Sequence, residues 1–167
     1  MSVTYLDGGA TLSACRTYRY FLWRQLSESS ARMLFVMLNP STADETKPDP
    51  TMTRCAGFAA REGCGRFGIV NLWAFRSKNP RALERAPDPV GPDNGSALVS
   101  AAAEHDRIVC AWGVGVHHVL GWENRVRDVL DLLGAWDDLL CFGVCRDGRT
   151  PRHPLMLRAD TPLVELP

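Results

Sequence analysis

The residues best suited to chemistry in this sequence are two asparagines and a histidine, Asn39, Asn71 and His153. An asparagine side chain presents one acceptor and two donors on one edge, which complements the amide or imide edge of a nucleobase. A histidine can donate to the negative charge that develops on a leaving group. The three side chains are therefore candidates for binding a base-like group and for easing the departure of a leaving group.

Asn71 interrupts an otherwise apolar stretch, residues 69–73. A buried amide that finds no partner costs about 1–3 kcal/mol, so this carboxamide needs a hydrogen-bonding group nearby. That group is either a ligand or a neighbouring loop, and Asn71 alone favours neither reading.

A second polar break follows residues 33–39, whose length and apolar composition predict a strand buried on both faces. Pro40 ends this strand because it cannot donate to a sheet ladder. The small polar residues Ser41 and Thr42 come next. In an open parallel sheet, ligands bind at the carboxyl ends of the strands, so we expect this break to form part of a site.

Later strand ends carry residues of the same kind. Trp73 closes the strand that contains Asn71, and Trp112 with Gly113 ends the next one. Glycine and asparagine are also the ordinary turn residues at strand ends, so each one singly is explained without a site. Because the carboxyl ends of parallel strands share one edge of the sheet, the set as a whole favours one cleft.

His153 lies on the loop that follows the last predicted strand. Pro151 and Pro154 restrict the backbone on both sides of it and can fix where the imidazole points. The alternative is an ordinary exposed histidine, since the chain has four histidines.

The elements that must position these residues alternate between strands and helices. We expect strands at residues 32–38, 67–73, 107–112 and 139–143, and helices at 50–63, 93–105 and 116–133. This alternation predicts the α/β class: a three-layer α/β/α fold with a mostly parallel, four-stranded central sheet. Residues 18–26 predict an N-terminal edge strand or hairpin, and residues 162–166 a last strand. The length predicts a single domain.

The composition is that of a globular protein without a strong charge. Apolar residues make up 46% and charged residues 23% of the 167 positions, and the formal net charge is zero. A net charge of zero argues against high-affinity, non-specific binding to DNA and against attraction to a membrane surface.

The cysteines and the N-terminus bound the environment. The six cysteines show no zinc-type spacing, so we expect no metal and no cofactor. The sequence carries no signal peptide and no apolar run of membrane length, which predicts a cytoplasmic protein with reduced thiols and no membrane partner. The oligomeric state is not predicted.

Several motifs, taken in order, resemble the bacterial family known as domain of unknown function 1643. The matching stretches are residues 38–44, 49–51 with Arg54, 71–73, 88–91 with Asn94, 112–113 and 151–155. The resemblance runs from about residue 18 to the end. This family label implies no function by itself.

A more distant resemblance is to the uracil-DNA glycosylase superfamily, whose mismatch-specific branch has a Gly-Ile-Asn-Pro-Gly motif where this chain has residues 38–41. It implies the α/β/α fold of that superfamily. It also implies that Asn39 positions an attacking water, Asn71 reads the base edge, and His153 lies beside the base carbonyl or the sugar-phosphate.

The mechanism implied by this resemblance is hydrolysis of an N-glycosidic bond. Asp44 would deprotonate the water held by Asn39, and Trp73 or Trp112 would stack on the base. A cluster of arginines would contact phosphates, its alternative being a solvated loop balanced by acids: Arg146, Arg149, Arg152 and Arg158 against Asp147 and Asp160. The other expected substrate-binding residues are Pro40, Ser41, Thr42, Arg54 and Gly113.

Two other functional classes remain open. The acid-rich loop after Thr42 and the zero net charge fit an enzyme acting on a free nucleotide or modified nucleoside better than one acting on a duplex. The third class is a non-catalytic module that binds a nucleotide or a protein partner.

Overall fold

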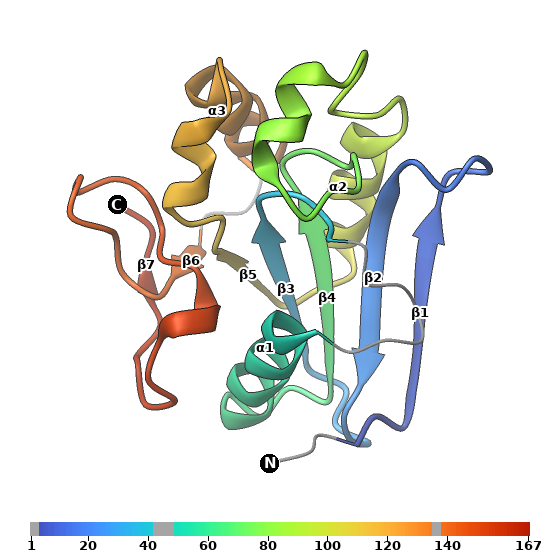
Figure 1. Cartoon of the computed structure of the whole chain (residues 1–167). Coiled ribbons are helices and arrows are strands. Elements are labelled where there is room, and N and C mark those ends of the chain that lie inside the picture. Colours follow the sequence, from blue (N-terminus) through green and yellow to red (C-terminus); the bar gives the residue numbers. More distant parts are fainter. Residues whose placement is uncertain (1–3, 42–48, 135–137) are drawn as a thin grey trace.

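The computed structural model describes residues 4–41, 49–134 and 138–167. Over these residues the chain forms one sheet of seven strands in the order β1-β2-β4-β3-β5-β6-β7 (Figure 1). The strands are β1 (Asp7–Leu12), β2 (Arg19–Gln25), β3 (Arg32–Met37), β4 (Arg66–Asn71), β5 (Arg107–Cys110), β6 (Leu139–Cys141) and β7 (Val164–Glu165). The four strands β4, β3, β5 and β6 are mutually parallel, whereas β1, β2 and β7 pair antiparallel with their neighbours.

The α/β class is confirmed, but the prediction of a four-stranded, mostly parallel sheet is wrong, because the sheet is larger and mixed. The four expected strands form only its parallel centre. The N-terminal region forms a hairpin in which β1 takes the edge and β2 pairs with β4 inside the sheet. β1 gives little signal in the sequence, since Asp-Gly-Gly-Ala-Thr-Leu has two glycines and no apolar alternation.

β3 is buried on both faces, as its composition predicted. Leu34 and Val36 pack in one apolar cluster with residues of α2 and α3, and Phe35 and Met37 pack in a second cluster with residues of α1. Since successive side chains of a strand point to opposite faces, one apolar strand supplies the centre of two cores.

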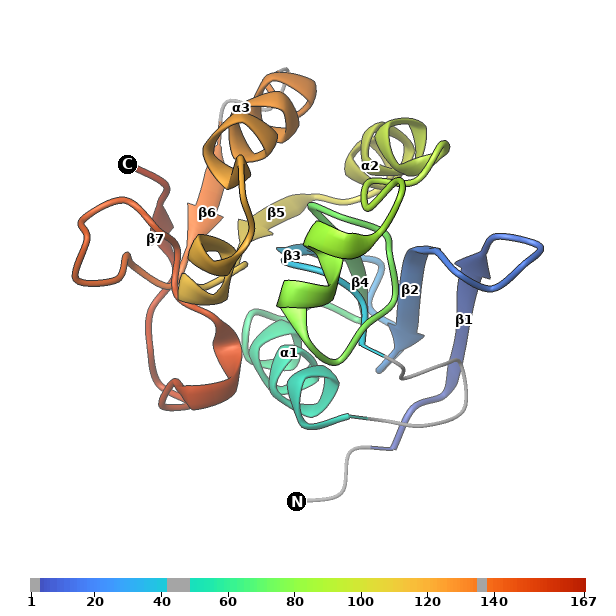
Figure 2. The same cartoon turned by 45° about the horizontal axis from the view of Figure 1, so that its top comes forward.

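Helices cover both faces of the sheet (Figure 2). α1 (Pro50–Arg61) lies on one face, and α2 (Asn94–Ala103) with α3 (Trp122–Leu132) lies on the other. α1 begins as the sequence predicted: the Asp49 side chain caps it by accepting from the Met52 backbone N–H at 2.7 Å, and Pro50 occupies the first turn. The described residues also contain three short 3-10 helices: η1 (Pro80–Arg85), η2 (Val114–His118) and η3 (Pro154–Met156).

The prediction of one helix over residues 116–133 is wrong. The segment contains η2 and α3, with a break at residues 119–121. Gly121 stands at this break with φ +74°, a left-handed conformation that residues with a Cβ rarely adopt. The apolar stripe of the sequence continues across the break, so the pattern alone did not reveal it.

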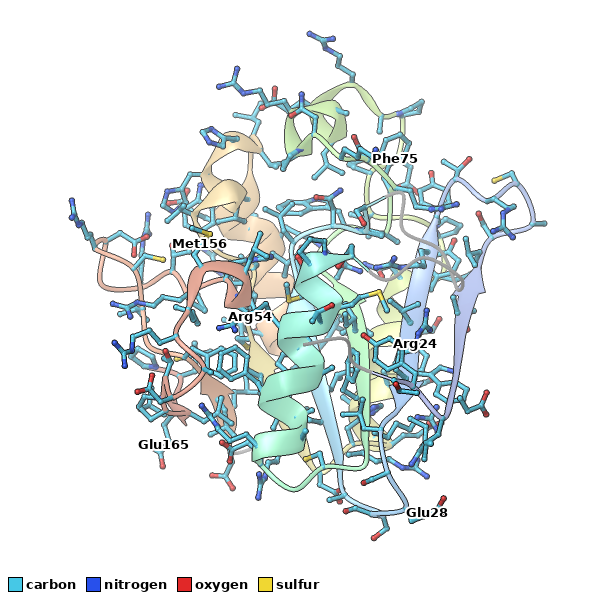
Figure 3. The ribbon with its side chains drawn as sticks, turned by 60° about the horizontal axis from the view of Figure 1, so that its bottom comes forward. Arg24, Glu28, Arg54, Phe75, Met156 and Glu165 are labelled. Atoms are coloured by element: carbon cyan, nitrogen blue, oxygen red, sulfur yellow. The ribbon has the colours of Figure 1, made fainter. Side chains whose placement is uncertain are left out.

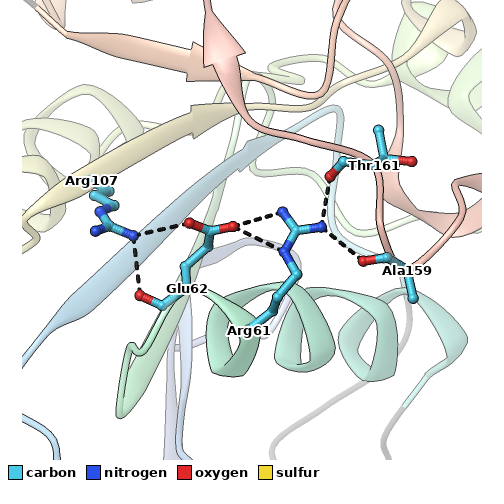
Figure 4. A network of polar contacts seen from close by, with 5 residues as sticks. All are labelled: Arg61, Glu62, Arg107, Ala159 and Thr161. Atoms are coloured by element: carbon cyan, nitrogen blue, oxygen red, sulfur yellow. Dashed lines mark hydrogen bonds and ion pairs between the residues drawn. The ribbon is translucent and has the colours of Figure 1, made fainter.

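The carboxyl end of α1 is anchored to distant parts of the chain (Figure 4). Arg61 Nη1 donates to the backbone carbonyls of Ala159 and Thr161 at 2.8 and 2.7 Å, and Glu62 pairs with Arg61 and with Arg107 of β5. These contacts fix the far end of α1. Because the helix follows β3 and precedes the parallel strand β4, its amino end lies at the carboxyl edge of the sheet.

Candidate functional site

A cavity of about 360 Å³ lies at the carboxyl ends of β3, β4 and β5. The amino end of α1, residues 77–80, the start of η2 and the loop bearing His153 complete its walls. Its volume is within the range of small-molecule sites, about 300–1,000 Å³. The expected site residues that line it are Asn39, Ser41, Asn71, Trp112, Gly113 and His153.

Asn71 ends β4, and its side chain is only 1% exposed. Neither Oδ1 nor Nδ2 has a hydrogen-bond partner among the described residues. Its backbone is nevertheless held firmly. Asn94 Nδ2 donates to the carbonyls of Asn71 and Leu72 at 3.1 Å each, and Arg125 Nε donates to Leu72 O at 2.6 Å. The strand end is therefore fixed while the carboxamide in the cavity wall keeps its hydrogen-bonding groups available.

Asn39 holds a neighbouring loop, which was one of the two roles that the sequence left open for Asn71. Its Nδ2 donates to the backbone carbonyls of Ser77 at 2.8 Å and Pro40 at 3.1 Å. Ser77 N–H in turn donates to Pro40 O at 2.9 Å. Asn39 thus ties the 75–77 segment to the end of β3 through its Nδ2, and its Oδ1 accepts no hydrogen bond from a described residue.

His153 is held in the cavity wall by the ends of β5 and β6. Gly113 N–H donates to Pro151 O, and Arg152 N–H donates to Gly143 O, both at 3.0 Å. Gly113 has φ +71°, and a Cβ placed on it would lie 2.7 Å from the His153 Cβ. Glycine at 113 is therefore required both by the backbone conformation and by the approach of His153.

The contacts of the His153 ring determine which nitrogen carries its proton. The Leu155 backbone N–H donates to Nδ1 at 3.2 Å, so in the neutral ring the proton resides on Nε2. Burial lowers the pKa of His153, and the charge of Asp49 partly opposes this shift. The side chain is therefore a neutral Nε2–H donor at neutral pH.

Five polar residues that the sequence reasoning missed also line the cavity: Arg19, Asp49, Thr51, Ser77 and Lys78. The carboxylate of Asp49 accepts from Ser41 Oγ at 3.0 Å as well as capping α1. Its position had a usable signal, because a helix that follows a parallel strand begins at the ligand-binding edge. Arg19 had none, since an expected edge strand gives no reason to bury an arginine.

Arg19 is a buried cation in this wall. Its side chain is 4% exposed, and burial lowers its pKa to about 10 while the charge of Asp49 raises it. The Asp49 carboxylate therefore lies in an electrostatic environment shared with Arg19 and His153.

Trp112 is 3% exposed and packs in the cluster shared with α2 and α3. Its indole Nε1 has no hydrogen-bond partner in the part of the chain that the structure describes. The side chain lines the cavity and supplies a potential N–H donor in addition to apolar surface.

Other expected site residues are not in the cavity wall. Trp73 is buried in the cluster shared with α2 and α3, and Pro40 is also buried. Arg54 extends from α1 toward the C-terminal segment near Met156, where its Nη2 donates to Leu157 O and its guanidinium lies 5.2 Å from the Phe58 ring centre (Figure 3). The predictions for Thr42 and Asp44 fall outside the described residues.

Three of the four arginines expected to contact phosphates, Arg149, Arg152 and Arg158, make contacts within the protein. Arg149 pairs with Glu123 at 3.0 Å, and Arg152 Nε donates to Val144 O at 3.1 Å. Arg158 pairs with Asp160 at 3.0 Å. None of the four, Arg146 included, lines the cavity.

The described residues contain no group of three or more histidine, cysteine or acidic side chains that could hold a metal ion. Within the same residues, no helix has the length and apolar character needed to cross a membrane.

The family model described as Protein of unknown function (DUF1643) matches residues 19–155. The chain belongs to this family. The match runs from β2 to η3, so the DUF1643 region contains Asn39, Asn71, Gly113 and His153. The searches of the curated proteins and of the solved structures returned no match. The family assignment does not test the resemblance to uracil-DNA glycosylases, which therefore stays a prediction.

Proposed function

We propose that this protein recognises a nucleobase in the cavity and hydrolyses the N-glycosidic bond between that base and its sugar. The observation that carries the proposal is the buried carboxamide of Asn71, which lines the cavity with both polar atoms unpaired among the described residues. A ligand that presents an acceptor beside a donor, as a base does, satisfies both atoms and relieves the cost of leaving them unpaired.

The surroundings of Asn71 support a flat, partly apolar ligand. Met37, Met52 and Ile69 line the cavity beside the amide, and all three are almost completely buried. Apolar walls with a few fixed polar groups are typical of small-molecule sites. The indole N–H of Trp112 offers one further donor to such a ring.

His153 supports the departure of the base. A base that leaves an N-glycosidic bond takes the bonding electrons and becomes negatively charged. A neutral Nε2–H can donate a hydrogen bond to this developing charge, and the bond stabilises the charge most where water is partly excluded, as in the cavity wall.

The attacking water has two candidate partners in the cavity wall. Asn39 Oδ1 can accept one hydrogen bond from it, since Nδ2 is occupied by the 75–77 segment. Asp49 supplies a carboxylate that can accept the proton as the water attacks the anomeric carbon. In this proposal Asp49 takes the place that the sequence suggested for Asp44.

A free nucleoside or nucleotide suits the site better than a base within a duplex. Three of the four arginines expected to follow a phosphate backbone, Arg149, Arg152 and Arg158, contact carbonyls or carboxylates of the protein itself, and so does Arg54. Recognition of DNA rests largely on such phosphate contacts. The proposal therefore names free nucleosides and nucleotides as the first substrates to test.

The test measures binding by calorimetry and base release by chromatography. Free nucleosides, nucleoside monophosphates and oligonucleotides that contain normal, deaminated and modified bases serve as probes. We expect wild-type protein to bind or cleave at least one of them. The Asn71→Leu variant loses that binding, and Asn124→Leu, the same change at an exposed position of α3, keeps it. Equal binding by wild type and Asn71→Leu contradicts the proposal.

A further inference from the structure

A second polar cluster lies outside the cavity, formed by His117, Asp147 and Thr150. His117 Nε2 lies 2.9 Å from Thr150 Oγ1 and 3.2 Å from Asp147 Oδ2. The ring of Trp122 packs against the imidazole, with the ring centres 4.7 Å apart. The cluster therefore joins η2 to the turn that precedes the His153 loop.

Thr150 is the centre of this cluster. Its side chain is 1% exposed, and its hydroxyl donates to Asp147 Oδ2. Asp147 Oδ1 also accepts from the backbone N–H groups of Arg149 at 3.1 Å and Thr150 at 2.9 Å. These hydrogen bonds lower the pKa of Asp147 to about 2, so the carboxylate is ionised over the whole neutral range.

The hydrogen bonds continue from Thr150 to His153. Thr150 O accepts from Cys145 N–H at 2.7 Å, and the next two residues are fixed by the Pro151 and Arg152 contacts with the ends of β5 and β6. On the other side, η2 carries His117 and also places Val114 in the cavity wall. The cluster thus fastens two walls of the cavity to each other.

We infer that Thr150 is a positioning residue for His153: its hydroxyl, held between Asp147 and His117, fixes the 150–153 segment against η2 and so fixes the His153 ring in the cavity wall. The catalytic meaning of this position rests on the proposed function. The position itself does not, because the state of the His153 ring can be observed without a substrate.

The experiment records the ring signals of isotope-labelled histidines by NMR in wild type, Thr150→Val and Thr150→Ser. Valine keeps the shape of threonine and removes the hydroxyl, whereas serine keeps the hydroxyl. We expect wild type to show the Nε2–H form of His153, and Thr150→Val to show shifted signals and a mixture of the two neutral forms. Thr150→Ser restores the wild-type signals. His105, at the opposite edge of the sheet, is the internal control and stays unchanged.

Binding of the nucleoside probe gives the second readout. Thr150→Val lowers the affinity by about tenfold, the effect expected when a displaced His153 loses one well-formed hydrogen bond to the nucleoside. Thr150→Ser keeps the wild-type affinity. Unchanged His153 signals in Thr150→Val overturn the inference. If that variant does not fold, Asp147→Asn undergoes the same measurement, where shifted His153 signals support the inference and unchanged signals overturn it.

The two proposals fail in distinguishable ways. If wild type binds no nucleoside and Thr150→Val still shifts the His153 signals, the proposed function fails and the positioning role of Thr150 stands. If wild type binds a nucleoside and the His153 signals ignore Thr150, the positioning role alone fails.

Discussion

Asn39 and Asn71 show how one residue type takes two roles at neighbouring strand ends. They stand at the ends of the neighbouring parallel strands β3 and β4. Asn71 ends β4 opposite Met37, and Asn39 comes two residues after Met37. The side-chain N–H groups of Asn39 donate to the backbone carbonyls of Phe75 and Ser77. Neither side-chain polar atom of Asn71, Oδ1 or Nδ2, makes a hydrogen bond with a described residue. Such unpaired groups in a binding site lower the stability of the free protein, and the hydrogen bonds of a bound ligand offset this loss.

This cost predicts an opposite effect of one substitution on stability and on binding. Asn71→Leu replaces the buried carboxamide by an apolar group of similar shape, so we expect the free energy of unfolding to rise by about 1–3 kcal/mol. Denaturant titration measures the change, with Asn39→Leu as the comparison. Asn39→Leu should be destabilising because it removes the hydrogen bonds to the 75–77 segment. A loss of stability in Asn71→Leu would show that the amide supports the fold.

His105 predicts how stability depends on pH. The ring is 7% exposed, and its Nδ1 contacts Ala101 O at 2.6 Å while Nε2 has no partner among the described residues. Burial lowers the pKa of His105 from the usual value of 6.5, so the folded state resists protonation. Below that value the unfolded chain binds more protons than the folded one. Stability is therefore complete above pH 6.5 and falls as the pH decreases, by at most about 1.4 kcal/mol per pH unit for this group.

Urea titrations between pH 8 and pH 5 measure this dependence. His153 has a pKa shifted in the same direction and adds to the slope. The His105→Asn variant keeps a donor near the Nδ1 position and removes the titrating group, so its slope should be smaller than that of wild type. Equal slopes in the two proteins would exclude His105 as a source of the pH dependence.

At the scale of elements, the turn after β5 determines where His153 lies. Gly113→Ala forces a Cβ into the left-handed region, which costs about 1–2 kcal/mol, and places it within 2.7 Å of the His153 Cβ. Gly121→Ala has the same backbone penalty at φ +74° with nothing nearby. We expect both variants to lose stability in thermal unfolding and Gly113→Ala to lose more. Only Gly113→Ala should also lose nucleoside affinity, and equal losses in both would contradict this role of the turn.

Elements with a strong pattern were predictable, and elements defined by pairing were not. The apolar run of β3 and the Asp49-Pro50 start of α1 carry their own signal, and both are confirmed. β1 exists because it pairs with β2, and two glycines in its sequence conceal it. The break between η2 and α3 depends on the left-handed conformation of Gly121, which no hydrophobic period reports.

The candidate site follows the same distinction. Asn39, Asn71, Gly113 and His153 could be placed at one edge because the carboxyl ends of parallel strands meet there. Trp73 does not line the cavity, since the side chain that follows a buried strand can turn into the core as readily as into a cleft. The partners of arginines were not predictable, because carbonyls such as Leu157 O and Val144 O become available only in the folded chain.

At the scale of the whole molecule, charge separates a free nucleotide from a nucleic acid as the ligand. The formal net charge is zero, and Arg149 and Arg158, which lie outside the cavity, pair with carboxylates of the protein. A formal net charge of zero gives no long-range positive field that would draw in a polyanion. A ligand that depends on Asn71 and His153 is held by short-range hydrogen bonds, which salt screens only weakly.

This contrast predicts a weak salt dependence of binding. The affinity for a nucleoside or nucleoside monophosphate should change little between 50 and 300 mM salt, whereas DNA held through two to four arginine–phosphate contacts gives a slope of about −2 to −4 in the logarithm of the affinity against that of salt. Calorimetry with both ligands measures the two slopes. As a control, Arg149→Gln removes an exposed cation that lies outside the cavity and should leave nucleotide affinity unchanged. The opposite result is a steep salt dependence of DNA binding that becomes shallower in Arg149→Gln. It would mean that the Arg149–Glu123 pair opens to bind a phosphate, and it would identify nucleic acid as the partner.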